Sequence, residues 1–365
     1  MKKCYLLLLS CLLCACSYQQ EIHLEEAMSY SQQYEGYTYY RNLLTGINKD
    51  AYDVFYYHIS QMDSSFSLQA EDDDAFMLII DYVMKDHPEL FWYDAMDVSY
   101  SIHEQQGSNV YDIHTKLKKK QTEIEQEKQQ VNEKAAVLLT EMKKLPSDYE
   151  KAKYAYDYII DHTNYNEDSK ENQNILSVFL YEDSVCAGYA KTFQYLMNAC
   201  GIPCVYMTGG TKYSSDNHAW NMVLLDGSYY YMDTTNGDYS NETIDQRIRY
   251  AYFAMDTAQM LQLYTPDDPY EITKATIDNY FVKENLYLDT TSMDKLSFLI
   301  QQSVQDEDQK GFLFQCNTKE TCTTISQSLE HQDTIFRLLD KAGYHAEQYK
   351  SIIIPETNVW LYSYK

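Results

Sequence analysis

The stretch from residue 217 to residue 233 constrains the fold most, because it predicts an antiparallel hairpin whose turn can be located. Asp226-Gly227 separates an apolar run from an aromatic run. Aspartate followed by glycine between two such runs is typical of a two-residue turn, which needs a positive φ at both central positions. The sequence therefore predicts two paired strands in this stretch.

The predicted turn fixes which side chains of the hairpin share a face. A tight turn places Leu225 opposite Ser228, and counting outward places Trp220 opposite Asp233. His218 is then a diagonal neighbour of Asp233 on the same face, within side-chain reach. A shift of one residue in the turn would move Asp233 to the other face and remove this contact.

A helix is predicted just before the hairpin. Apolar groups recur at helical spacing, and Gly201 and Pro203 mark the end of the pattern. The positions of these groups are 186, 189, 190, 193, 196, 197 and 200. Cys186 then lies in the first turn, where the helix N-terminus favours a thiolate over a thiol. Glu182 and Asp183 would oppose that effect if they lay close.

Cysteine, histidine and aspartate in this order predict nucleophilic catalysis. The His218 imidazole can give one nitrogen to the Asp233 carboxylate while the other takes the Cys186 proton. Taken singly, each residue has an ordinary structural explanation, since a helix-start cysteine is usually a small buried group. Together they meet three positional demands within one continuous stretch.

These residues resemble the transglutaminase-like superfamily in its three signature segments. The upstream helix that ends before Tyr165 is similar to the lead-in of that family, and the resemblance covers residues 148–237. The matching segments are Val-Cys-Ala-Gly-Tyr-Ala at 185–190, His-Ala-Trp at 218–220 and Met-Asp-Thr-Thr at 232–235. The resemblance implies a papain-like α+β core with nucleophile Cys186, base His218 and orienting Asp233.

One difference from the animal members of the family indicates which branch of the superfamily the chain resembles. Ala187 stands where animal crosslinking enzymes have a tryptophan, so the chain looks like the microbial branch, whose members include peptidases, amidases and inactive binding modules. Calcium dependence is therefore not carried over. The side chain that completes an oxyanion hole is not identifiable, and the backbone N–H of Cys186 is one candidate donor.

The N-terminus predicts export. Lys2 and Lys3 precede an apolar run over residues 5–13 that is too short to span a bilayer. The following Leu-Cys-Ala-Cys resembles the lipobox of Gram-positive-type bacterial lipoproteins, with Cys16 as the lipidated residue. Cys11 is a competing position, and a plain secretory peptide or an N-terminal membrane anchor are alternatives. Each alternative places the protein outside the cytoplasm.

Length and composition predict a globular protein of several units. Of the 365 residues, 45% are hydrophobic and 15% aromatic, which is enough material for packed cores. The net charge of −26 argues against nucleic acid and against non-specific attraction to anionic lipid. We expect a signal peptide at 1–16, a tether at 17–33, a mixed N-terminal α+β domain at 34–114, a linking helix at 115–145, a transglutaminase-like domain at 146–278 and a small C-terminal α/β domain at 279–365.

Other local patterns are less informative. The acidic run 71–74 is interpreted as the start of a helix rather than a calcium loop, because the alternating oxygen ligands and the glycine of such a loop are missing. Cys200 and Cys204 are expected to be small buried side chains, with a disulfide possible and a zinc site disfavoured. In the C-terminal unit we expect extended 280–282, a helix from 292, a strand at 311–316, a second helix ending near 343 and extended 351–354 and 359–362.

Two functions are carried forward. The first is a surface-anchored cysteine acyl-transfer enzyme, either a protease or amidase or a crosslinking transglutaminase, acting on protein or peptide substrates that include cell-wall peptide. The second is an inactive peptide- or cell-wall-binding lipoprotein in which Trp220 and the tyrosines at 229–231 line a groove; Trp220 is also the expected substrate contact in the enzyme. Strand packing is the ordinary explanation for these aromatics. No cofactor and no metal are expected.

Overall fold

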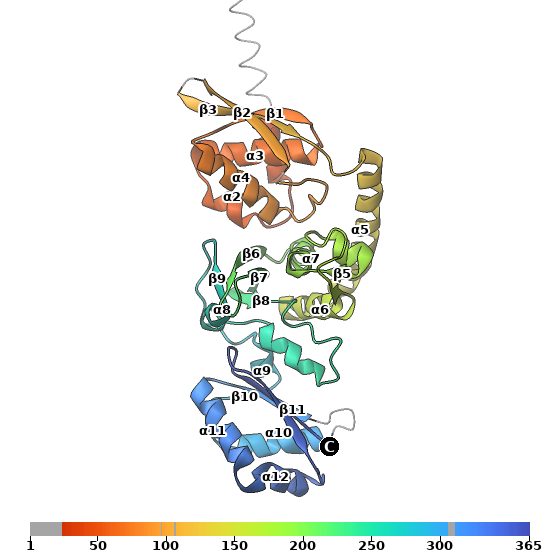
Figure 1. Cartoon of the computed structure of the whole chain (residues 1–365), viewed down its shortest axis with the longest axis vertical. Coiled ribbons are helices and arrows are strands. Elements are labelled where there is room, and N and C mark those ends of the chain that lie inside the picture. Colours follow the sequence, from red (N-terminus) through yellow and green to blue (C-terminus); the bar gives the residue numbers. More distant parts are fainter. Residues whose placement is uncertain (1–23, 96, 106, 306–310) are drawn as a thin grey trace, which may run out of the picture.

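The computed structural model describes residues 24–95, 97–105, 107–305 and 311–365. Helices and strands are mixed in an α+β arrangement, as the sequence predicts. Figure 1 shows three tiers along the long axis, with a helix and sheet unit at each end and the α7 and β6–β8 region between them. Within the described residues, no helix has the length and apolar character needed to cross a membrane.

The N-terminal tier packs helices against a three-stranded antiparallel sheet in the order β1-β3-β2. Its elements are α2 (Tyr39–Leu43), α3 (Gly46–Ser60), β1 (Ser65–Ala70), α4 (Asp73–Asp86), β2 (Val98–Gln105) and β3 (Ser108–Thr115). The Asp72 side chain accepts a hydrogen bond from the Ala75 N–H, so the acidic run caps α4 as expected.

Part of the predicted tether is structured. Residues 24–32 are helical, Ala27 is fully buried, and the Tyr30 ring contacts Tyr56 and Tyr57. The expectation of a tether is therefore wrong for this part of 17–33. The segment is mostly polar, but its aromatic packing against α3 is enough to hold it in place. Residues 17–23 lie outside the described residues.

A long helix leads from the first tier to the second. α5 (Gln121–Met142) begins six residues later than expected, since β3 extends to Thr115. One face of α5 is buried along most of its length. α6 (Asp148–Asp161) follows and is capped by Ser147, whose side chain accepts from the Glu150 N–H.

The central tier combines helices with a four-stranded antiparallel sheet in the order β8-β7-β6-β9. Its strands are β4 (Asn164–Tyr165), β5 (Asp183–Ser184), β6 (Cys204–Thr211), β7 (Asn217–Leu225), β8 (Ser228–Met232) and β9 (Tyr264–Pro266). Its other helical elements are η1 (Ser177–Tyr181), α7 (Cys186–Ala199), η2 (Gln246–Tyr252) and α8 (Thr257–Leu263).

The C-terminal tier has a second hydrophobic cluster of its own. Its four strands run in the order β10-β11-β13-β12. The elements are α9 (Tyr280–Lys283), β10 (Tyr287–Leu288), α10 (Met293–Gln305), β11 (Gly311–Cys316), α11 (Lys319–Glu330), η3 (His331–Asp333), α12 (Thr334–Ala342), β12 (Tyr349–Ile354) and β13 (Val359–Tyr364).

Two expectations for this tier are wrong. The extended 280–282 is the short helix α9, because the Asn279 side chain caps it and Tyr280 stacks on Tyr250 at 4.0 Å between ring centroids. The single helix before Gly343 is two helices, since Gln332 and Asp333 take positive φ and break it.

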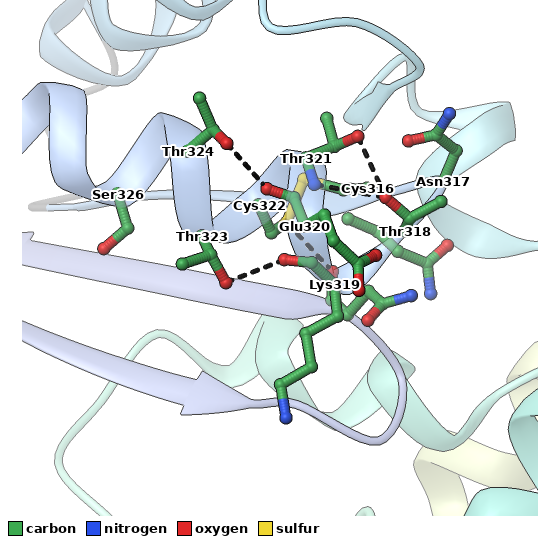
Figure 2. The surroundings of a disulfide bond; sticks show 12 residues. Cys316, Asn317, Thr318, Lys319, Glu320, Thr321, Cys322, Thr323, Thr324 and Ser326 are labelled. Atoms are coloured by element: carbon green, nitrogen blue, oxygen red, sulfur yellow. Dashed lines mark hydrogen bonds between the residues drawn. A yellow bond between two sulfur atoms is a disulfide. The ribbon is translucent and has the colours of Figure 1, made fainter.

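A disulfide that the sequence did not predict closes a short loop of the C-terminal tier. Cys316 at the end of β11 pairs with Cys322 in the first turns of α11. Figure 2 shows the bond within the polar loop that contains Thr318, whose side chain caps α11 by accepting from the Thr321 N–H. Cys186, Cys200 and Cys204 are free thiols, so the possible bridge between the last two is absent.

Candidate active site

The Cys186 thiol is located at the start of a helix, as predicted. α7 begins at Cys186, and its N-cap residue Val185 gives no side-chain hydrogen bond to the first turn. The thiol is partly exposed and packs against a small apolar cluster, which consists of Val185, Ala187, Ala190, Tyr206 and Ala219. The uncapped first turn leaves N–H groups and the helix dipole directed toward this end of α7.

A glycine allows the start of α7 to lie close to the preceding chain. A Cβ at Gly188 would lie 2.1 Å from Ser184 Oγ, 2.3 Å from Ser177 Oγ and 3.0 Å from the Asn172 carbonyl oxygen. Only a residue without a side chain fits there. The position of Cys186 therefore depends on close packing of α7 against η1 and β5.

The hairpin has the predicted register. Leu225 lies opposite Ser228, and the β7–β8 ladder ends with Asn221 opposite Met232. Asp233 follows directly, and its N–H donates to the Tyr252 carbonyl rather than to β7.

His218 and Asp233, the two candidate catalytic residues of the hairpin, are in contact, as the register predicted. The Nε2 atom of His218 lies 2.8 Å from Asp233 Oδ2. The other ring nitrogen, Nδ1, is then the one left for the Cys186 sulfur.

The Asp233 carboxylate is fully buried and accepts hydrogen bonds on both oxygens. Oδ1 accepts from the backbone N–H groups of Thr235 at 3.0 Å and Asn236 at 2.9 Å. Oδ2 accepts from the Asn236 side-chain amide at 2.9 Å and from the Tyr264 hydroxyl. Burial alone would raise the Asp233 pKa, but His218 and these donors hold it below its usual value.

His218 is held between the acid and an aromatic wall. Its side chain is 10% exposed, and its ring stacks on Tyr264 with 5.3 Å between centroids. Burial lowers the His218 pKa, but the Asp233 carboxylate and hydrogen bonding to Asp233 and Cys186 raise it to about 10. The imidazole is therefore positively charged at neutral pH in this arrangement.

The Trp220 side chain is not exposed to solvent or to a substrate. Its side chain is fully buried and stacks on Tyr264 with 4.4 Å between ring centroids. The expectation of Trp220 as a substrate contact is wrong, because the indole forms the floor beneath the His218 and Tyr264 rings. Tyr230 and Tyr231 are also fully buried, which corrects the aromatic groove expected for the binding alternative.

Sequence reasoning missed two residues of this site. Tyr264 comes from β9 and Asn236 from the turn after Asp233; their side chains are joined at 2.7 Å and both donate to Asp233 Oδ2. Asn236 could have been found as an amide three residues after an aspartate, a common turn arrangement. Tyr264 carries no local signal, since it is separated from Asp233 by 31 residues.

No metal site accompanies these residues. Across the part of the chain that the structure describes, no group of three or more His, Cys, Asp or Glu side chains is arranged to hold an ion.

A protein-family model matches the part of the chain that contains the candidate active site. The family model described as the transglutaminase-like superfamily matches residues 109–234, a span that encloses Cys186, His218 and Asp233. The chain carries a transglutaminase-like domain. The match begins within β3, so it reaches further toward the N-terminus than the predicted boundary at 146.

The relatives of this transglutaminase-like domain are distant. The Kyphoscoliosis peptidase of Mus musculus is 24% identical over 141 residues, covering 33% of this chain and 21% of that protein. The Homo sapiens protein is 28% identical over 97 residues, covering 23% of this chain and 15% of that protein. A crystal structure of a TGase is 14% identical and covers 47% of this chain and 50% of its own, with a TM-score of 0.28. The chain thus spans about a fifth or less of the curated relatives' length.

Proposed function

We propose that the transglutaminase-like domain is a cysteine acyl-transfer enzyme acting on peptide or carboxamide bonds through Cys186, His218 and Asp233. The observation that carries the proposal is His218, whose Nε2 is 2.8 Å from Asp233 Oδ2 while hydrogen bonding to Cys186 helps to raise its pKa. Nucleophile, base and orienting acid then form one connected chain.

The reaction divides into two steps. The Cys186 sulfur attacks the substrate carbonyl carbon and forms a tetrahedral intermediate. Its collapse breaks the C–N bond, and the His218 imidazolium gives its proton to the leaving amine. The resulting thioester is then attacked by water or by a second amine, whose proton goes to His218; the C–S bond breaks, and the Cys186 thiolate is released beside the imidazolium. Water gives hydrolysis, and a lysine amine gives a crosslink.

The groups around the triad match the demands of these steps. Asp233 is held charged by its buried donors and therefore orients and stabilises the imidazolium. The developing oxyanion needs donors near the thiol, and the backbone N–H of Cys186 at the uncapped start of α7 is a suitable one.

We also propose an extracytoplasmic location with a lipid anchor on Cys16, which lies outside the described residues. The Cys316–Cys322 disulfide supports this location, because such bonds persist in oxidising compartments. Substrates at the cell surface would be proteins or peptides, including cell-wall peptide.

Alkylation by iodoacetamide tests the triad directly. We expect Cys186 to react at pH 6 at least about tenfold faster than Cys200, whose pKa is raised by burial and which serves as an internal control. His218→Ala should remove that advantage, and His162→Ala, at an exposed histidine after α6, should keep it. Adducts are located by mass spectrometry. Equally slow labelling of Cys186 in the wild type and in His218→Ala would contradict the proposal that His218 activates Cys186 for catalysis.

A further inference from the structure

Lys191 is a cation of α7 that the proposed reaction does not use. It is partly buried, and its Nζ atom lies 5.2 Å from the centroid of the Tyr206 ring. An ammonium group at this distance is attracted by the face of a tyrosine ring, which holds the lysine side chain against the sheet. Lys191 therefore has a defined position rather than a free, solvated one.

Tyr206 connects this ammonium group to the nucleophile. Tyr206 is on β6, is 7% exposed, and belongs to the small apolar cluster against which Cys186 packs. Burial raises the Tyr206 pKa, and the nearby Cys186 charge raises it further. The lysine and the thiol thus both lie near the same aromatic side chain.

Two of the charged groups near Lys191 form ion pairs with other residues. Lys118, Lys85 and Asp81 are the charged groups that act on it. Lys85 and Asp81 pair with each other at 2.7 Å, and Lys85 also pairs with Asp268 at 2.6 Å.

Lys191 itself has no carboxylate within 4.0 Å among the residues that the structure describes. Burial and repulsion by Lys118 lower its pKa to about 8.

We propose that Lys191 sets the substrate class of the active site, so that the preferred acyl donor is an acidic peptide with a carboxylate close to the attacked carbonyl. This inference rests on the proposed function and names its substrate. Burial deprives the Lys191 ammonium group of hydrating water, and no neighbouring carboxylate among the described residues compensates for the loss. A carboxylate on the substrate would supply that compensation, so an anionic substrate should bind more tightly than a neutral one. A neutral donor would leave the cation unpaired.

Two alkylating reagents that differ only in charge test the inference at the thiol. The ratio of iodoacetate to iodoacetamide rates at Cys186 reports the local positive charge, because both reagents react by the same displacement. We expect Lys191→Met to lower the ratio at pH 6.5 about fivefold. Lys191→Arg should preserve it, and Lys350→Met, an exposed lysine of β12, should leave it unchanged.

The pH dependence separates the lysine from the histidine. In the wild type the ratio should fall as pH rises through about 8, where Lys191 loses its proton, while His218 with a pKa of about 10 is still charged. Lys191→Arg should abolish this fall. A wild-type ratio without a change near pH 8 would argue against Lys191 even if Lys191→Met proved unstable.

Turnover of peptide pairs then tests the substrate class. Two peptides that differ by Glu against Gln beside the scissile bond should differ in kcat/KM, and Lys191→Met should reduce the preference for Glu. Slow iodoacetamide labelling of Cys186 in every variant would overturn the proposed function. Fast labelling with an unchanged ratio in Lys191→Met would overturn only the inference.

Discussion

At the residue scale, the site depends on a tyrosine that the hairpin does not contain. The Tyr264 hydroxyl donates to Asp233 Oδ2 and accepts from the Asn236 amide at 2.7 Å. We predict that Tyr264→Phe lowers the iodoacetamide rate of Cys186 at pH 6 about tenfold, because a buried hydrogen bond to a charged group contributes about 1.5–3 kcal/mol. The loss should be largest at low pH, since Asp233 with one donor fewer is more easily protonated.

A matched control separates this effect from a general loss of stability. Tyr52→Phe also removes a buried tyrosine–aspartate hydrogen bond, the one of 2.9 Å to Asp86 in the N-terminal tier. It should lower the free energy of unfolding without changing the pH profile of Cys186. Identical pH profiles for the Tyr264→Phe variant and the wild type would remove Tyr264 from the positioning of the triad.

At this scale the sequence predicts pairs within one hairpin and little beyond it. The Asp226-Gly227 turn was enough to place His218 near Asp233, because strand pairing has a fixed period. The same counting says nothing of Tyr264, which arrives from another strand, or of the burial of Trp220, which is set by that tyrosine.

At the element scale, the start of α7 is positioned by contact rather than by helix propensity. We predict that Gly188→Ala lowers the free energy of unfolding by about 1–3 kcal/mol, since a methyl group would have to displace Ser184, Ser177 and the Asn172 backbone. The same change should slow Cys186 alkylation, because it shifts the first turn that carries the thiol. Urea unfolding and the alkylation rate measure the two effects.

Gly210→Ala is the control at the same scale. Gly210 lies in β6, and a Cβ there would meet no heavy atom within 4 Å. This variant should change stability by no more than about 0.5 kcal/mol and leave the alkylation rate unaltered. If both alanine variants behaved alike, packing at Gly188 would not be what positions Cys186.

Helices with a clear apolar period were predictable, and short elements fixed by distant contacts were not. α4, α6 and α7 combine a periodic face with caps or end signals in the sequence. α9 has four residues and owes its form to the Asn279 cap and to the stacking of Tyr280. The break before α12 uses Gln332 and Asp333 at positive φ, where no glycine gives warning.

At the scale of the whole molecule, the first and second tiers are joined by polar contacts that no sequence pattern announces. The Tyr40 hydroxyl donates to the Tyr206 carbonyl at 2.8 Å, and the Gln194 amide donates to the Lys85 carbonyl at 2.8 Å. The Lys85 ammonium group, almost buried, pairs with Asp268 at 2.6 Å. These contacts link residues more than 100 positions apart, beyond the range of any local period.

The Lys85–Asp268 pair gives the prediction for the molecule as a whole. Both side chains are 8% exposed, so Lys85→Met would leave a buried carboxylate without its cation, at a cost of about 3–5 kcal/mol. Lys153→Met removes a more exposed pair, with Asp157 at 2.8 Å, and should cost about 0.5 kcal/mol. Urea unfolding compares them. Because Lys85 repels Lys191, loosening this junction should also raise the pH at which the iodoacetate preference is lost. A stability loss without that shift would show that the junction supports the fold but does not set the charge beside the thiol.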